Sequence, residues 1–237
     1  MSAVVVSALL PLKASVVVDF TTAGWYSNQG VAPTNTPGSD NYFAAGEFHG
    51  NQFEDFFNFN LLNFTGTVTS ATITITNRQD TIPAVSPNAS DTYQLSDSTA
   101  NPANLANGTA TFGIVGVNPY GSFSADFNTI TDGEQFTITL DAAAITALNA
   151  AIGTGTFTTA GAVTTAAGSN DYLFVGEGGG ATLPLAGDVF LSLTGTVQPT
   201  AGPAPEPASL VLTGSALIGL GWFALRRKTA PGPSRLG

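Results

Sequence analysis

The sequence predicts an all-β protein, a β-sandwich of jelly-roll type with one short helix, followed by a transmembrane helix near the C-terminus. Short runs of alternating apolar and polar residues recur between residues 16 and 197, separated by clusters of Gly, Asn, Asp and Pro. Only 9% of the residues are charged, against roughly 25% in typical soluble domains. Thr, Ser, Asn and Gln must therefore supply the polar surface, as is common in secreted β-rich proteins.

Four segments show the alternation most clearly, with apolar residues at most of the alternate positions on one face. These inward-facing sets are Phe53, Phe57 and Phe59; Ala71, Ile73 and Ile75; Phe136, Ile138 and Leu140; and Val189, Leu191 and Leu193. Further strands are expected at residues 92–95, 109–115, 122–127, 157–159 and 172–175. About ten short strands with turn residues between them indicate a sandwich.

One segment, "DAAAITALNAAI", has helical spacing instead. Asp141 is a favourable N-cap residue, and Ile145, Leu148 and Ile152 follow at intervals of three and four. We expect a single short helix here that caps or crosses the sandwich.

The N-terminal residues 1–15 resemble a signal peptide, with an apolar run from Ala3 to Leu12 and small residues at Ala14 and Ser15. The basic residues that usually precede such a run are missing, which a start upstream of Met1 would explain. The alternative is a buried first strand, because residues 4–6 and 16–18 are all Val.

A membrane span is predicted at residues 208–225, which carry no charge. As a helix they would extend roughly 27 Å, close to the hydrocarbon thickness of a bilayer. Arg226, Arg227 and Lys228 follow directly, as in a stop-transfer signal, and predict that the tail 226–237 is cytoplasmic and the preceding chain exported. A buried core helix would not explain three adjacent cations.

Before this span, residues 198–207 form a Pro-rich linker that ends in Pro205, Glu206 and Pro207. Because proline excludes helix, the linker is expected to be extended and accessible. The tripeptide, the Gly-bearing apolar helix and the basic cluster together resemble the PEP-CTERM sorting signal of Gram-negative exopolysaccharide producers. The resemblance implies that an exosortase-like membrane protease recognises Pro205, Glu206 and Pro207 and releases the domain from the inner membrane to the cell surface or the extracellular matrix.

Charge and cysteine content limit the partners of the domain. Between Asp19 and Val197 there are fifteen acidic residues and one basic residue, Arg78, a net charge of −14. Such a domain is expected to repel nucleic acid, whose phosphates require Lys and Arg. With no Cys in the chain, neither disulfides nor thiolate metal sites can form.

The sequence offers little for catalysis, and we expect no enzyme. His49 is the only imidazole and lies in a segment predicted to be an exposed loop. Glu54 and Asp55 are adjacent on a predicted strand and should point to opposite faces, so they cannot form the facing carboxyl pair of a glycoside hydrolase. Glu47 and Glu177 occupy similar positions in two related segments, 39–47 and 169–177, but nothing in the sequence brings them together.

Two binding functions remain open at this point. Asp40, Asp91 and Asp171 lie in loops rich in oxygen ligands and are weak Ca²⁺ candidates, although ordinary Asx-turns explain them more simply. Trp25, Tyr26 and Tyr120 are candidate glycan contacts, as in a carbohydrate-binding module, although most aromatic residues of a sandwich are core. The expected role is structural or adhesive, with exopolysaccharide or other matrix components as partners; the alternatives are a carbohydrate-binding module and, more remotely, a hydrolase.

Overall fold

The structure, a computed structural model, describes residues 14–31, 44–77, 84–168, 170–174 and 187–200. The chain divides into two compact units, Met1–Pro199 and Thr200–Gly237. Most of the expected signal peptide, the Pro-Glu-Pro motif, the expected membrane span and the basic tail lie outside the described residues. Within the described part, no helix is both long enough and apolar enough to cross a membrane.

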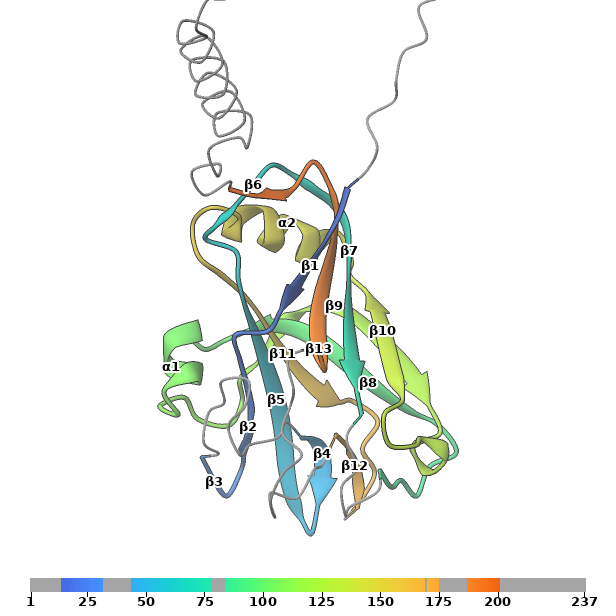
Figure 1. Cartoon of the computed structure of the whole chain (residues 1–237). Coiled ribbons are helices and arrows are strands. Elements are labelled where there is room, and N and C mark those ends of the chain that lie inside the picture. The colour runs from blue at the N-terminus through green and yellow to red at the C-terminus, as the bar shows by residue number, and fades with distance from the viewer. Residues whose placement is uncertain (1–13, 32–43, 78–83, 169, 175–186, 201–237) are drawn as a thin grey trace, which may run out of the picture. The chain divides into compact units, whose positions relative to one another are not determined.

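The prediction of an all-β protein is confirmed, and the first sheet has four antiparallel strands in the order β1-β13-β7-β10. Of these four strands, β1 comes first and β13 last along the chain. The two pair side by side, as Figure 1 shows for the blue β1 and the orange β13. The strands are β1 (Ala14–Asp19), β7 (Val68–Thr76), β10 (Gln135–Thr139) and β13 (Val189–Gly195).

The second sheet has eight strands, with a central path β12-β4-β5-β11-β8-β9, with β2 paired to β5 and with β3 paired to β2. The long strand β5 (Asn51–Asn60) pairs with β2, β4 and β11. The other strands are β2 (Thr22–Ser27), β3 (Gly30–Val31), β4 (Ala45–Phe48), β8 (Asp91–Ser98), β9 (Val115–Ala125), β11 (Thr156–Val163) and β12 (Asp171–Leu173). A short pair, β6 (Phe64–Thr65) and β14 (Gln198–Pro199), completes the described strands.

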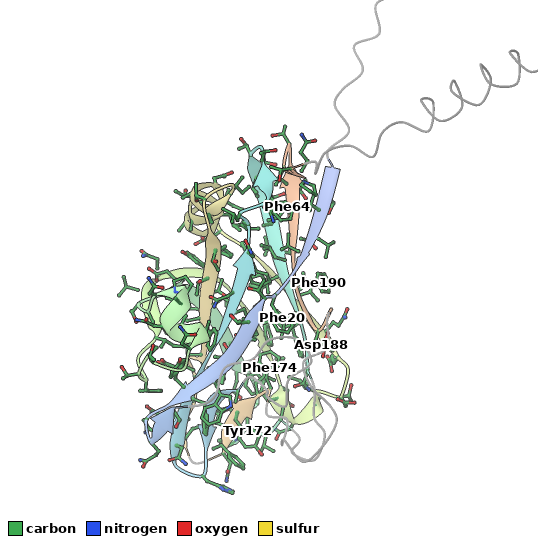
Figure 2. All side chains as sticks on the ribbon, turned by 60° about the vertical axis from the view of Figure 1, so that its left-hand side comes forward. Phe20, Phe64, Tyr172, Phe174, Asp188 and Phe190 are labelled. Carbon is green, nitrogen blue, oxygen red and sulfur yellow. The ribbon has the colours of Figure 1, made fainter. Side chains whose placement is uncertain are left out.

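The two sheets face one another across one hydrophobic core. Side chains of β1, β7, β10 and β13 belong to the same buried cluster as side chains of β5, β8 and β11. Phe20 and Phe174, labelled in Figure 2, are among its largest fully buried members. Each such phenylalanine stabilises the fold by about 1.5–3 kcal/mol through burial alone. The inward positions predicted from alternation on β7, β10 and β13 all belong to this cluster or pack against it.

The predicted helix is confirmed as α2 (Ala142–Ala151), which covers the upper end of the sandwich in Figure 1. The Asp141 carboxylate caps it by accepting from the Ala144 amide at 2.9 Å. The expectation of only one helix is wrong, because α1 (Pro102–Ala106) lies against the second sheet and a 3-10 turn, η1 (Phe127–Thr129), follows β9. Asn101 caps α1 and Pro102 begins it, but five residues carry too little periodicity to be recognised.

The strand predicted at residues 109–115 is also wrong, since only Val115 belongs to a strand. The segment that includes α1 instead covers the outer face of the second sheet. There Tyr26 and Phe56 pack with Leu105, Ala110 and Ile114 in a second hydrophobic cluster. The apolar residues of this segment are therefore buried by covering a sheet and not by joining one.

Candidate functional site

Two buried carboxylates from distant parts of the chain meet where β8 and β12 begin. Asp91 and Asp171 are both 0% exposed. The Asn88 amide nitrogen donates to Asp91 Oδ1 at 2.7 Å and to Asp171 Oδ2 at 3.0 Å. One side chain thus bridges both acids, which we call the carboxylate pair. Of the three Ca²⁺ candidates, Asp91 and Asp171 are brought together, and Asp40 lies outside the described residues.

Backbone hydrogen bonds fix the segments that form the carboxylate pair. Val85 and Tyr172 exchange two of them, at 3.3 and 3.0 Å, so residues 84–88 run beside β12. The Asn128 side chain holds Ser86 in the same way, accepting from its amide at 3.2 Å and donating to its carbonyl at 2.9 Å. The position of the carboxylate pair is therefore set by the pairing of Val85 with β12 and by the side chain of Asn128.

The loop between β11 and β12 supplies two further donors. Thr165 Oγ1 donates to Asp91 Oδ1 at 2.9 Å, and the Ala167 amide donates to Asp171 Oδ2 at 2.9 Å. The same Thr165 hydroxyl accepts from the Thr92 amide at 2.9 Å, which ties the loop to the first residues of β8. One oxygen of each carboxylate is therefore well satisfied.

The other oxygen of each carboxylate has no such partner. Asp91 Oδ2 and Asp171 Oδ1 are buried, and no hydrogen-bond donor of the described residues reaches them. Burial raises the pKa of Asp171; the Ala167 amide opposes this, and the neighbouring Asp91 charge raises the pKa further. The described ranges contain no Lys or Arg, so none of their side chains offsets the two negative charges.

A third buried carboxylate, Asp55 of β5, lies inside the sandwich. It is 0% exposed, and the Tyr93 hydroxyl donates to its Oδ1 at 2.7 Å. Burial raises the pKa of Asp55 to about 8, although the Tyr93 hydrogen bond lowers it and the Glu54 charge raises it. The group is thus largely protonated at neutral pH. Since solvent does not reach it, we assign it a structural role.

Glu54 and Asp55 point to opposite faces, as the strand alternation predicted. Glu54 Oε2 accepts from the Gly113 and Ile114 amides at 2.9 and 2.7 Å on the outer face of the second sheet, where it anchors the segment after α1. Glu54 and Asp55 therefore do not form the facing carboxyl pair that a glycoside hydrolase needs. Glu47 lies on β4 opposite Asp171, and Glu177 lies outside the described residues.

His49 lies in the turn between β4 and β5, with a positive φ of 50°. It is exposed, and its ring stacks on Phe48 with a centroid distance of 4.0 Å. The prediction of an exposed loop histidine is confirmed. Among the described residues, no three His, Cys, Asp or Glu side chains gather as metal ligands.

The structure separates the three candidate glycan contacts. Tyr26 is 0% exposed and its hydroxyl donates to the Leu105 carbonyl at 3.0 Å. Tyr120 is 6% exposed and stacks on Phe157. Neither ring has a face open to solvent, so of the three only Trp25, which is partly exposed, is positioned to touch a glycan.

Trp25 belongs to an aromatic cluster at one end of the second sheet, formed with Phe48, Phe53 and Tyr172. Trp25 meets Phe53 edge to face at 4.9 Å, and Phe48 meets Tyr172 in the same way at 4.7 Å. Tyr172 marks this end of the sheet in Figure 2. Trp25, Phe48 and Phe53 each keep part of their surface accessible, so the aromatic cluster presents an accessible apolar surface.

Sequence reasoning missed the partners of these acids. Asn88, Ser86 and Thr165 are short polar loop residues of a kind that occurs throughout the chain, so nothing distinguishes them. The burial of Asp55, however, had a signal, because it has the same strand parity as Phe53, Phe57 and Phe59. No protein-family model matches the chain, and no curated protein matches it.

Proposed function

We propose that this chain is an exported protein of the cell surface or extracellular matrix, sorted by a C-terminal PEP-CTERM-type signal and carrying a structural or adhesive domain. The observation that carries the proposal is the order of three parts: Pro205-Glu206-Pro207, the uncharged segment 208–225, and the cluster Arg226, Arg227 and Lys228. The division of the chain after residue 199 is compatible with a separate sorting segment. An exosortase-like protease of the inner membrane would be its processing partner.

The domain itself is, in this proposal, a jelly-roll sandwich. The four-stranded sheet has the order β1-β13-β7-β10, and the central part of the other sheet has the order β5-β11-β8-β9. In these eight strands the first lies beside the last, and consecutive strands change sheet except at β8 and β9. This order is typical of two interlocked Greek keys. The transmembrane helix at 208–225 remains part of the proposal.

The outer face of the four-stranded sheet supports an adhesive role. Its cross-strand rows are rich in hydroxyl groups and nearly free of charge. One row holds Val17, Ser192, Thr72 and Thr139, and the next holds Asp19, Phe190, Thr74 and Thr137. Of these hydroxyls, that of Thr74 is buried and bonded to that of Thr137, and the others reach the surface. Hydroxyls on a regular sheet can hydrogen-bond to neutral polysaccharide without the cost of desolvating ions. No catalytic activity is assigned to the domain.

Mass spectrometry of the C-terminal peptide, from protein recovered outside the native cells, tests the sorting proposal. We expect a terminus near residues 205–207, because the membrane-held precursor is released by cleavage there. Replacing both Pro205 and Pro207 by Ala should leave the full chain in the membrane, whereas the matched Pro203→Ala variant should be processed. An intact terminus at Gly237, found only in membranes, would make residues 208–225 a permanent anchor and end the sorting proposal.

A second candidate function, glycan binding, is favoured by the aromatic cluster. If the accessible rings stack on sugars, Trp25→Ala should weaken binding on a glycan array roughly fivefold, since an aromatic contact contributes on the order of 1 kcal/mol. Val117→Ala is the control, because Val117 is 91% exposed on β9 away from this cluster. Circular dichroism must show both variants folded. Saturable binding that is equal in both variants would remove the aromatic cluster as the site.

A further inference from the structure

We propose that the carboxylate pair, Asp91 and Asp171, binds a calcium ion that joins the start of β8 to the start of β12. The pair is built from segments about 80 residues apart and is held by hydrogen bonds to one oxygen of each carboxylate, while the other oxygen of each is buried and unpartnered within the described structure. The inference does not depend on how the C-terminus is processed.

Burying two carboxylates side by side costs free energy. A buried carboxylate without a cation or a full set of donors is unfavourable, and a second one beside it adds repulsion. Asp91 and Asp171 lie close together, because the amide nitrogen of Asn88 is within 3.0 Å of an oxygen of each carboxylate. Asn88 offsets part of this by bridging the carboxyls, but it reaches only Asp91 Oδ1 and Asp171 Oδ2. A cation between the two remaining oxygens would neutralise both acids at once.

The ligand chemistry selects a hard cation. Asn88, Thr165 and Ala167 point N–H or O–H donors at the two carboxylates, so the ligands that the pair offers are carboxylate oxygens, and the chain has no Cys. Oxygen-only sites suit Ca²⁺ and Mg²⁺ and disfavour Zn²⁺ and Cu²⁺. The two carboxylates are tied to loops of different strands, which suits the variable geometry of Ca²⁺ better than the strict octahedron that Mg²⁺ requires.

The site also has access and a source of further ligands. A surface pocket of about 380 Å³ is lined by Val85, Ser86, Pro87, Ala167, Gly168 and Asn170. Ser86 also contacts the Asp171 carboxylate through its side chain, and Ala167 binds the same carboxylate through its amide, so the pocket opens beside the carboxylate pair. Because Ca²⁺ takes six to eight oxygens, two carboxylates must be supplemented, and water from this pocket can complete the shell. Two charged ligands predict a modest affinity, on the order of 0.1–1 mM.

The test compares the thermal unfolding of the full chain in EDTA with its unfolding in about 10 mM CaCl₂, both in a mild detergent. This CaCl₂ concentration is well above the expected dissociation constant. Ligand binding to the folded state alone is expected to raise Tm by about 3–10 °C. Isothermal titration of the same protein with CaCl₂ should give one site per chain. MgCl₂ at equal concentration should shift Tm less.

Asp171→Asn is the deciding variant, because it keeps the shape and removes one ligand charge. In EDTA it should be at least as stable as the original chain, since the repulsion with Asp91 is gone, but its calcium-dependent Tm shift should disappear. Asp19→Asn, an exposed acid on β1, changes the net charge equally and should keep the full shift. Asp91→Asn should behave as Asp171→Asn does.

Two results would overturn the proposal. A titration of the unmodified chain without a binding heat, together with equal Tm in EDTA and CaCl₂, would mean that the two carboxyls share a proton instead. A calcium shift that persists in Asp171→Asn would mean that Ca²⁺ only screens the acidic surface. The first result needs no variant, so the test remains decisive even if both substitutions prevent folding.

Discussion

Replacing Asp55 by Asn is expected to stabilise the protein at neutral and alkaline pH and to remove most of the dependence of its stability on pH between about pH 4 and pH 8. The folded chain holds the pKa of Asp55 near about 8, against an ordinary value of 3.8. Between these two values the folded state keeps a proton that the unfolded state has lost. The free energy of unfolding therefore falls as pH rises, by up to about 1.4 kcal/mol per pH unit, and the loss is complete above pH 8.

Asn at position 55 preserves the shape of the carboxyl and still offers an oxygen to the Tyr93 hydroxyl, but it does not titrate. Urea unfolding at a series of pH values measures the difference directly. Asp171 also has a raised pKa and contributes to the pH dependence of stability. The original chain and the variant share this contribution, so the difference between their free energies of unfolding at each pH isolates the effect of Asp55. In the control variant Asp19→Asn, the free energy of unfolding should change with pH as steeply as in the original chain. Equal slopes in the original chain and Asp55→Asn would show that Asp55 is ionised in the folded protein.

Sequence alternation predicted the strands that turn an apolar face to the core and a polar face away from it. On β7, β10 and β13 the apolar residues recur at every second position because a hydroxyl-rich outer face separates them. On β5 the pattern fails: Phe56 and Phe57 are both 0% exposed, because the segment around α1 covers the outer face. Whether a sheet face is covered depends on the tertiary fold, which the local pattern does not contain.

The candidate site was predictable only as a list of separate acids. Asp91 and Asp171 were recognised as oxygen ligands in loops, but their meeting depends on Val85 pairing with Tyr172 and on β11 leading back to β12. Such long-range pairing is set by strand order, and strand order has no short sequence signal. Tyr26 and Tyr120 failed as candidate surface contacts for the same reason, since exposure of an aromatic ring is decided by what packs on it.

Gly161→Ala is expected to destabilise the protein by about 2–6 kcal/mol, although a Gly→Ala change within a strand is ordinarily favourable. Gly161 lies on β11 opposite Asp55, and a methyl group there would collide with the Tyr93 hydroxyl and with Asp55 Oδ1. Both atoms belong to the buried hydrogen bond between Tyr93 and Asp55. The methyl group must therefore either separate this pair, leaving two buried polar groups unpaired, or push β8 away from β11.

Gly155→Ala is the matched control, because a methyl group at Gly155 meets no atom within 4 Å. It precedes the same strand and is expected to change the free energy of unfolding by no more than about 0.5 kcal/mol. Tyr93→Phe removes the nearest colliding atom, so the double variant Tyr93→Phe, Gly161→Ala should lose less stability than the two single changes together. Additive losses would mean that the strands move apart as a whole, whereas a smaller combined loss would identify the Tyr93 hydroxyl as the group that requires glycine at position 161.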